Sequence, residues 1–118
     1  MGGFVILGVS LIIRKSKDIR ARISSFLKSR ISTQEFHNPS CGCVFKNPSN
    51  KSAGFLIESC GLTGFSKGDA CISKKHANFI VNLGKASYKD VDYLIQAIKE
   101  KVHTKHNIIL EEEIKRWV

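Results

Sequence analysis

The chain has 118 residues, 42% of them hydrophobic and 25% charged, which is an ordinary composition for a soluble globular protein. This length supports one modest hydrophobic core and is short for two. Lys and Arg total 19 against 10 Asp and Glu, a formal net charge of +9. Such a charge suits nucleic acid or phosphorylated metabolites, or it simply provides a solvated basic surface. Without interleaved aromatic residues or a nucleic-acid motif, we expect no nucleic-acid binding.

The four cysteines are expected to be reduced thiols, because no secretory signal directs the chain to an oxidising compartment: Cys41, Cys43, Cys60 and Cys71. One C-x-C pair followed by two single cysteines does not match the paired C-x2-C knuckles of zinc ribbons, so we predict no metal site. The ten apolar residues 4–13 are too few to span a bilayer. We therefore expect a cytoplasmic protein without a membrane segment.

The first third of the chain predicts a strand, a helix and a loop. Phe4–Ile13 is rich in Val and Ile, which favours a strand buried on both faces. From Lys17 to Ser29 the apolar residues recur at i, i+4, i+7 and i+8, which predicts an amphipathic helix with a core-facing stripe of Ile19, Ile23, Phe26 and Leu27. Ser32–Ser52 holds both prolines and reads as a long loop, a kind of segment that often carries function.

The rest of the chain predicts two helices and three strands. Ser52 is placed to cap a short helix that ends near Gly61, with Phe55, Leu56 and Ile57 facing inward. A second helix begins at Ser87, which forms an acidic capping box with Asp90, and its apolar stripe runs to Val102. The predicted strands are Ala70–Ser73, Asn78–Asn82 and Asn107–Ile114. The expected fold is therefore α+β, a small mixed sheet flanked by helices.

Two segments carry candidate chemistry. In residues 41–48 a glycine frees the backbone while Cys43, Lys46 and Asn47 supply a thiol, an ammonium group and an amide, although Cys also serves as a small core residue and Lys as a surface charge. In the terminal strand, alternation sends Glu112 to one face and Glu111 and Glu113 to the other. His76, at the entry to a strand, is as readily structural as functional.

Five segments resemble, in order and spacing, the C-terminal third of UDP-N-acetylenolpyruvoylglucosamine reductases, in the shorter form of that family. They are Ser40–Pro48 (SCGCVFKNP), Ser52–Glu58 (SAGFLIE), Cys60–Gly64 (CGLTG), Ile72–Asn82 (ISKKHANFIVN) and Leu110–Lys115 (LEEEIK). Two departures stand out, because the family usually has Ala at the position of Cys41 and commonly Lys at that of Thr63. Cys41 is therefore a second thiol that could stand in for Cys43.

The resemblance implies site residues. In the family, NADPH reduces FAD, the flavin passes a hydride to the enolpyruvyl group of UDP-N-acetylglucosamine enolpyruvate, and a Ser or Cys protonates the neighbouring carbon to give UDP-N-acetylmuramate. Cys43 occupies the proton-donor position and Glu113 that of the glutamate that assists it. Asn47, and with it Lys46, Ser73 and His76, match substrate-binding positions.

The resemblance also implies a division of the chain. Residues 1–15 look like the last strand of a missing FAD-binding domain, and residues 16–118 look like the C-terminal substrate-binding domain. FAD and NADPH would serve the complete enzyme, and neither is expected to bind this chain alone. A separate FAD-binding chain is therefore a candidate partner. The alternative is a truncated, non-catalytic fragment that binds nucleotide sugar, so whether the chain acts as an enzyme stays open here.

Overall fold

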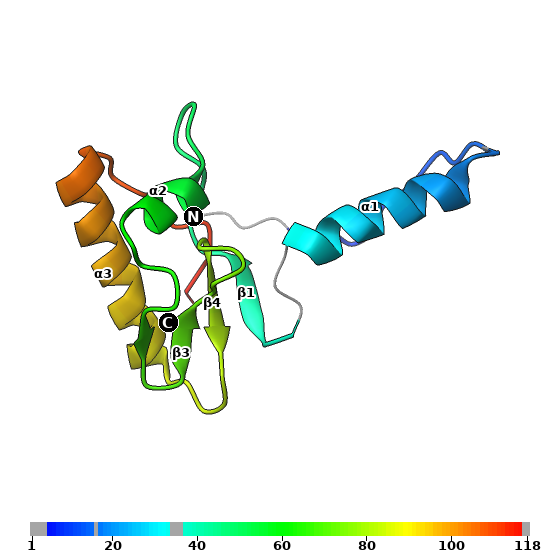
Figure 1. Ribbon diagram of the computed structural model, residues 1–118. Coiled ribbons are helices and arrows are strands. Elements are labelled where there is room, and N and C mark those ends of the chain that lie inside the picture. Colours follow the sequence, from blue (N-terminus) through cyan, green and yellow to red (C-terminus); the bar gives the residue numbers. More distant parts are fainter. Residues whose placement is uncertain (1–4, 16, 34–36, 117–118) are drawn as a thin grey trace.

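The computed structural model describes residues 5–15, 17–33 and 37–116, in which three helices accompany a four-stranded sheet (Figure 1). In chain order the elements are α1 (Ile19–Thr33), β1 (Ser40–Cys43), α2 (Ala53–Ser59), β2 (Ser66–Lys67), β3 (Ala70–Ile72), β4 (Phe79–Asn82) and α3 (Tyr88–His106). The sheet order is β1-β4-β3-β2. None of the helices in this described part is long and apolar enough to cross a membrane.

The sheet confirms the α+β class and corrects one detail of it. All three strand pairings are antiparallel, where we expected a mixed sheet. The reason is that β2, β3 and β4 follow one another through short connections, which return the chain antiparallel, whereas a parallel pair needs a long crossover. In β1 the register shifts between Ser40 and Cys43.

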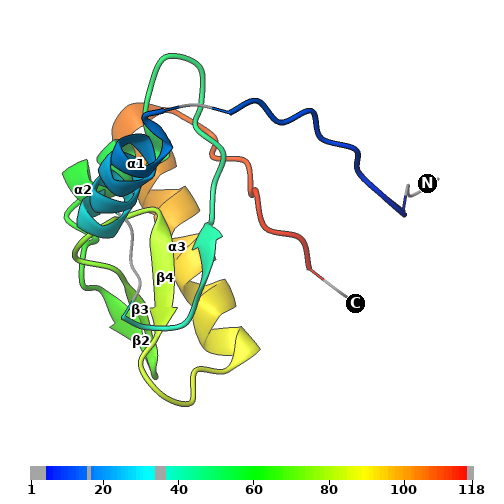
Figure 2. The same cartoon turned by 90° about the vertical axis from the view of Figure 1, so that its right-hand side faces the viewer.

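The core forms where α3 packs on the sheet and contacts α2 (Figure 2). The largest fully buried side chains are Val44, Phe45, Leu56, Ile57, Ile72, Leu94, Ile95, Ile98 and Val102. They come from α2, α3, β3 and the segment that follows β1, so residues far apart in sequence share one core. Burial of about 1.5–3 kcal/mol for each large apolar side chain makes this cluster the main source of stability.

The predicted helix caps are confirmed. The Ser52 hydroxyl accepts a hydrogen bond from the Phe55 N–H at the start of α2, and Gly61 after its end has the predicted positive φ of 71°. Ser87 and Asp90 form the capping box of α3. The prediction that Phe55 faces inward is wrong, because Ala53, Leu56 and Ile57 occupy the buried face of this two-turn helix and leave Phe55 64% exposed.

Two strands differ from the prediction, β1 and the predicted terminal strand. The predicted loop Ser32–Ser52 contains β1, whose sequence Ser-Cys-Gly-Cys lacks the β-branched and aromatic residues that signal a strand. Residues 34–36 of that loop lie outside the described part. The predicted terminal strand Asn107–Ile114 is reduced to one bridge, between Phe45 and Glu112. Two backbone hydrogen bonds support that bridge, from Lys46 N to Glu111 O (2.9 Å) and from Glu113 N to Val44 O (2.8 Å).

The N-terminal third departs most from the prediction. Residues 5–15 form neither helix nor strand, and their apolar side chains are exposed, because no strand of the described fold lies beside them; Phe4, the first residue of the predicted strand, lies outside the described residues. The predicted helix is present as α1, yet its apolar stripe is 45–65% exposed because α1 projects away from the body (Figure 1). The radius of gyration is 17.3 Å, compared with about 13–14 Å for a compact chain of this length.

Candidate active site

Cys43 ends strand β1, and the residues after it lie between two other segments. The Val44 N–H donates to the Asn78 carbonyl at 2.9 Å, and the Val44 carbonyl accepts from the Glu113 N–H at 2.8 Å. Val44 therefore lies between the residue that precedes β4 and the C-terminal segment. This arrangement fixes the backbone next to a half-buried thiol.

Asn78 fastens the same segment with its side chain. The amide is buried, its Oδ1 accepts from the Phe45 N–H (3.0 Å), and its Nδ2 donates to the Phe45 carbonyl (2.8 Å). The same amide also acts on the Cys43 thiol, whose pKa it lowers. Sequence reasoning gave Asn78 no role. The available signal was an amide within the run Ala77–Val81, which is otherwise apolar and buried.

The pKa of the Cys43 thiol is raised, first by burial and then by the negative charge of Glu113. Cys41 adds to the rise, and the hydrogen bond from Asn78 opposes it. A raised pKa keeps the thiol protonated at neutral pH. Glu113 is thus close enough to act electrostatically on Cys43, and its charge adds to the effect of burial in favouring the protonated thiol.

Lys46 and Asn47 follow directly along the chain. The Lys46 ammonium pairs with Glu111, but both side chains are more than half exposed, so solvent screening leaves the pair little energetic weight. The Asn47 Oδ1 accepts from the Ala53 N–H at 2.9 Å and so satisfies a backbone donor at the start of α2. The carbonyl oxygen of the Asn47 amide is therefore used by the fold.

Ser73 and His76 organise the turn between β3 and β4. The buried Ser73 hydroxyl accepts from the backbone N–H groups of Lys75 (3.1 Å) and His76 (3.2 Å). The His76 Nδ1 accepts from the Asn78 N–H at 3.3 Å, and its ring lies 4.7 Å from that of Phe79. Both side chains thus support the position of Asn78, and through it that of Cys43.

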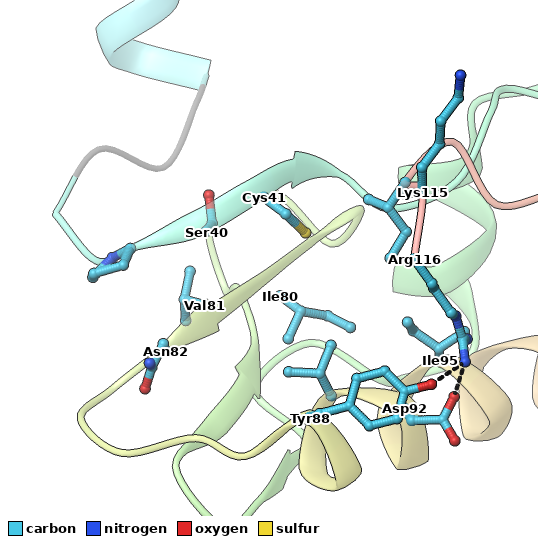
Figure 3. A pocket seen from close by; sticks show the side chains of 13 residues that line it. Ser40, Cys41, Ile80, Val81, Asn82, Tyr88, Asp92, Ile95, Lys115 and Arg116 are labelled. Atoms are coloured by element: carbon cyan, nitrogen blue, oxygen red, sulfur yellow. Dashed lines mark hydrogen bonds and ion pairs between the residues drawn. The ribbon is translucent and has the colours of Figure 1, made fainter. Parts of the chain in front are cut away.

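A cavity of about 500 Å³ lies beside strand β1, between β4, the first half of α3 and the C-terminal segment (Figure 3). Its wall is largely apolar, and Cys41 contributes to it. Cys43 is not among its lining residues, so the two thiols of β1 have different surroundings. Burial raises the pKa of Cys41 as well, but Glu113 is not among the causes there. We therefore place the candidate chemistry at Cys43 rather than at the cavity.

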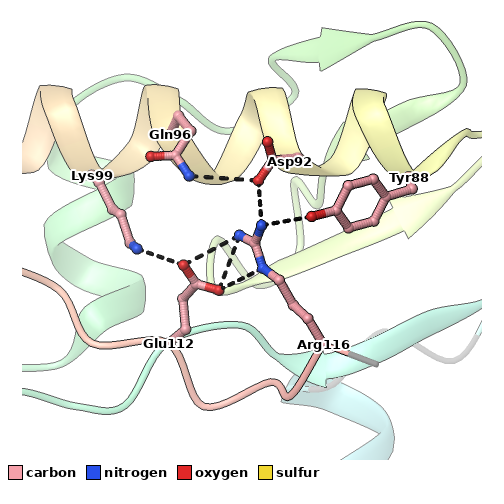
Figure 4. Close-up of polar contacts among 6 residues, drawn as sticks. All are labelled: Tyr88, Asp92, Gln96, Lys99, Glu112 and Arg116. Atoms are coloured by element: carbon pink, nitrogen blue, oxygen red, sulfur yellow. Dashed lines mark hydrogen bonds and ion pairs between the residues drawn. The ribbon is translucent and has the colours of Figure 1, made fainter. Parts of the chain in front are cut away.

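A polar cluster ties the C-terminal segment to α3 (Figure 4). Glu112 accepts from the Lys99 ammonium at 2.5 Å and from Arg116 at 3.1–3.3 Å. Arg116 also donates to Asp92 (2.7 Å) and to the Tyr88 hydroxyl (2.8 Å). Sequence reasoning put Glu112 on its own face but found no partner for it. The i, i+4 spacing of Tyr88 and Asp92 was the available signal.

The N-termini of α2 and α3 are already occupied by caps from the chain's own side chains. The pyrophosphate of a dinucleotide usually binds open backbone N–H groups at a helix N-terminus. Here the start of α2 is capped by Ser52 and Asn47, and the start of α3 by Ser87 and the carboxylate of Asp90. The part of the chain that the structure describes also contains no group of three or more His, Cys, Asp or Glu placed to hold a metal ion, and its four cysteines are free thiols.

Fold and site together define a small α+β domain with a half-buried thiol whose pKa is raised by burial and by a nearby carboxylate. A profile described as the C-terminal domain of UDP-N-acetylenolpyruvoylglucosamine reductase matches residues 34–117. The enzyme of that name from Thiobacillus denitrificans is 47% identical over 96 residues, covering 81% of this chain and 30% of its own length. That from Acaryochloris marina is 42% identical over 113 residues, covering 94% and 37%.

A solved structure agrees. The crystal structure of UDP-N-acetylenolpyruvylglucosamine reductase from Thermus caldophilus matches with a TM-score of 0.74 at 39% identity, over 92% of this chain and 38% of that one. The chain therefore belongs to the UDP-N-acetylenolpyruvoylglucosamine reductase family, through that family's C-terminal domain. It spans about a third of the length of the curated relatives it matches.

Proposed function

We propose that this chain is the substrate-binding and proton-donating part of a UDP-N-acetylenolpyruvoylglucosamine reductase. The observation that carries the proposal is the pairing of Cys43 with Glu113. A general acid must still hold its proton when substrate arrives, and the raised pKa of Cys43 meets that requirement. The choice of Glu113 over Glu112 is supported by the pairing of Glu112 with Lys99 on α3 and by the effect of the Glu113 charge on the pKa of Cys43.

The chemistry asked of this chain is one proton transfer. In this proposal the hydride reaches C3 of the enolpyruvyl group from a flavin that the FAD-binding portion of the enzyme would hold. The S–H bond of Cys43 then breaks as a C–H bond forms at C2, and the thiolate left behind takes a proton back from solvent. The Glu113 charge disfavours the thiolate before substrate arrives, and after the transfer the same charge favours reprotonation of the sulfur by solvent.

The substrate would lie across the surface formed by the segment after β1 and the β3–β4 turn. We assign Lys46 to a phosphate or carboxylate, because its exposed pair with Glu111 is weak enough to exchange for a substrate anion. Asn47 would donate from its amide NH2, since its carbonyl oxygen holds α2. Ser73 and His76 would shape the wall of the site. The net charge of +9 attracts such an anionic nucleotide sugar.

We further propose that residues 1–15 belong with an FAD-binding domain and residues 16–118 with the substrate domain. The exposed apolar side chains of residues 5–13 support this assignment, because they need a covering surface. That surface would be supplied by the rest of a longer protein or by a separate FAD-binding chain, with FAD and NADPH bound there. We place the protein in the cytoplasm, where the UDP-linked substrate and reduced thiols are compatible.

The second candidate is a non-catalytic fragment that binds nucleotide sugar. The capped starts of α2 and α3 support it, because they leave those two helix N-termini without open N–H groups for a flavin pyrophosphate. The two candidates differ in whether turnover appears once a flavin domain is added.

The test is co-expression with the FAD-binding portion of the Thiobacillus denitrificans relative. We expect the 118-residue chain alone to purify colourless, and the pair to form a yellow complex that oxidises NADPH only when the enolpyruvyl substrate is present. The flavin portion without this chain is the control. A complex that binds substrate without NADPH oxidation would favour the non-catalytic fragment, and a yellow chain purified alone would overturn the domain assignment.

A further inference from the structure

Three consecutive glutamates form the C-terminal segment at the site, so their register decides which carboxylate meets Cys43. Successive side chains of an extended segment point to opposite faces. A slip by one residue would turn Glu113 away from the thiol and bring another glutamate of the run to it. The run Glu111–Glu113 cannot by itself distinguish these registers, because all three side chains are the same.

The backbone supplies little to fix that register. A single bridge, between Phe45 and Glu112, joins this segment to the rest of the fold, with one hydrogen bond on each side of it. A regular ladder of several residues would resist slippage, whereas one bridge leaves much of the choice to side chains. The buried Leu110 anchors the start of the run in the core, and the polar contacts act on the glutamates themselves. The Lys46–Glu111 pair is exposed and adds little preference.

The polar cluster on α3 supplies what the backbone lacks (Figure 4). Glu112 is the least exposed member of its ion pairs, with 19% of its side chain accessible, and it accepts from both Lys99 and Arg116. Arg116 is itself held from α3 by Asp92 and Tyr88. These cations lie on the α3 side of the segment, where Glu112 reaches them, whereas Glu111 on the other face pairs with Lys46. By alternation Glu113 shares the face of Glu111.

We propose that Lys99 and Arg116 are positioning residues that select Glu112 from the run of three glutamates and thereby set Glu113 opposite Cys43. Neither touches the thiol. They act through the register of the segment, so their effect on Cys43 must pass through Glu113. The inference rests on the proposed pairing of Cys43 with Glu113, but it concerns geometry that exists without substrate or flavin.

The test is a double-mutant cycle read by alkylation of Cys43 with iodoacetamide across pH, on the full chain. Alkylation is followed in the peptides of a protease digest, and a Cys41→Ser background leaves Cys43 as the one thiol of its peptide. The alkylation rate of Cys71, which lies in another peptide, monitors folding. In this background Glu113→Gln should speed Cys43 alkylation near neutral pH, because loss of the carboxylate lowers the thiol pKa. In the Lys99→Met, Arg116→Met variant that acceleration should shrink to a ratio of about one.

Matched variants separate positioning from general damage. Lys101→Met, at an exposed site on the same helix, should keep the full acceleration, and Lys99→Arg should restore it when Arg116 is intact. Equal acceleration by Glu113→Gln with and without Lys99 and Arg116 would overturn the positioning role while leaving the proposed function standing. If Glu113→Gln fails to change the Cys43 rate even in the parent chain, both the pairing and the inference fall.

Discussion

The N-terminal region and the body of this chain use similar side chains with opposite results. Residues 5–13 include Leu7 and Ile12, which are 94% and 96% exposed, whereas Ile57 and Leu94 in the body are fully buried. The sequence of the first region is the more hydrophobic of the two. The difference lies in what surrounds them, because apolar side chains stabilise a fold only where another element covers them.

The largest effect on stability is expected from a comparison of two leucines, one in the body and one in the N-terminal region. Leu94 in α3 is fully buried and Leu27 in α1 is 52% exposed, and both are helical. Leu94→Ala should lower the free energy of unfolding by about 2–5 kcal/mol, since it removes buried surface and leaves a cavity. Leu27→Ala should change it by less than about 0.5 kcal/mol. Urea unfolding of both variants measures the contrast, and equal losses would show that α1 is part of the cooperative core.

The next effect concerns the clamp, by which we mean the two hydrogen bonds between the Asn78 amide and the backbone of Phe45. Asn78→Ala should cost about 2–3 kcal/mol, because it leaves the N–H and C=O of Phe45 without partners in a buried place. The variant should also make Cys43 more readily alkylated, as the segment loosens. Asn82→Ala, at the end of β4, is the comparison: its amide oxygen also accepts from two backbone N–H groups, those of Gly84 and Ala86, but does not bond the segment after β1, so Cys43 alkylation should stay unchanged. A Cys43 alkylation rate unchanged by Asn78→Ala would separate the clamp from the thiol.

A smaller effect concerns the polar cluster. The hydrogen bond from Lys99, then Coulombic attraction to Lys99 and Arg116, lower the pKa of Glu112 against the opposing effect of burial. A carboxyl whose pKa is lower in the folded state stabilises the fold above its unfolded pKa of about 4.3, and that stability is lost as pH falls through the folded value. Glu112→Gln should therefore cost below about 1 kcal/mol at pH 7 and nothing once the pH lies below both values. A cost that persists unchanged in acid would contradict this origin.

The smallest effect on stability is expected from removing the N-terminal region. A chain of residues 34–118 should have a free energy of unfolding within about 0.5 kcal/mol of that of the full chain. The reason is that the apolar side chains described in residues 5–31 are exposed and contribute little burial. Its tendency to self-associate should fall, since exposed apolar surface drives association. Sedimentation at several concentrations measures this, and a large loss of stability on truncation would show that the two regions depend on each other.

The same contrast explains which structural features could be predicted from sequence. The helices α2 and α3 and the strands β3 and β4 were predictable, because Ser52, Ser87 and the apolar stripe to Val102 are local signals that the packed body agrees with. The exposure of residues 5–13 and of the apolar stripe of α1 was not predictable. Hydrophobic periodicity indicates a face that needs covering, but it does not show whether another element of this chain covers it. Strand β1 lacked any strand-favouring residue, and its pairing with β4 depends on contacts about forty residues away in sequence.

The candidate site divides in the same way. The segment around Cys43 and the alternation of the three glutamates could be found in the sequence, but the register of Glu113 against Cys43 could not, since it depends on Lys99 and Arg116. Asn78 escaped notice because its role lies in two backbone groups of Phe45, which no side-chain pattern reveals.

The most direct measurement of the central claim follows the two half-reactions separately in the complex reconstituted with a flavin domain. Cys43→Ala should leave NADPH-driven flavin reduction intact and slow reoxidation by the enolpyruvyl substrate by about 10²–10⁴-fold, the usual contribution of a general acid. Cys43→Ser should keep measurable reoxidation, and Cys41→Ala should be close to the parent. Damage from Cys41→Ala together with a mild Cys43→Ala would contradict the assignment of Cys43 as the proton donor.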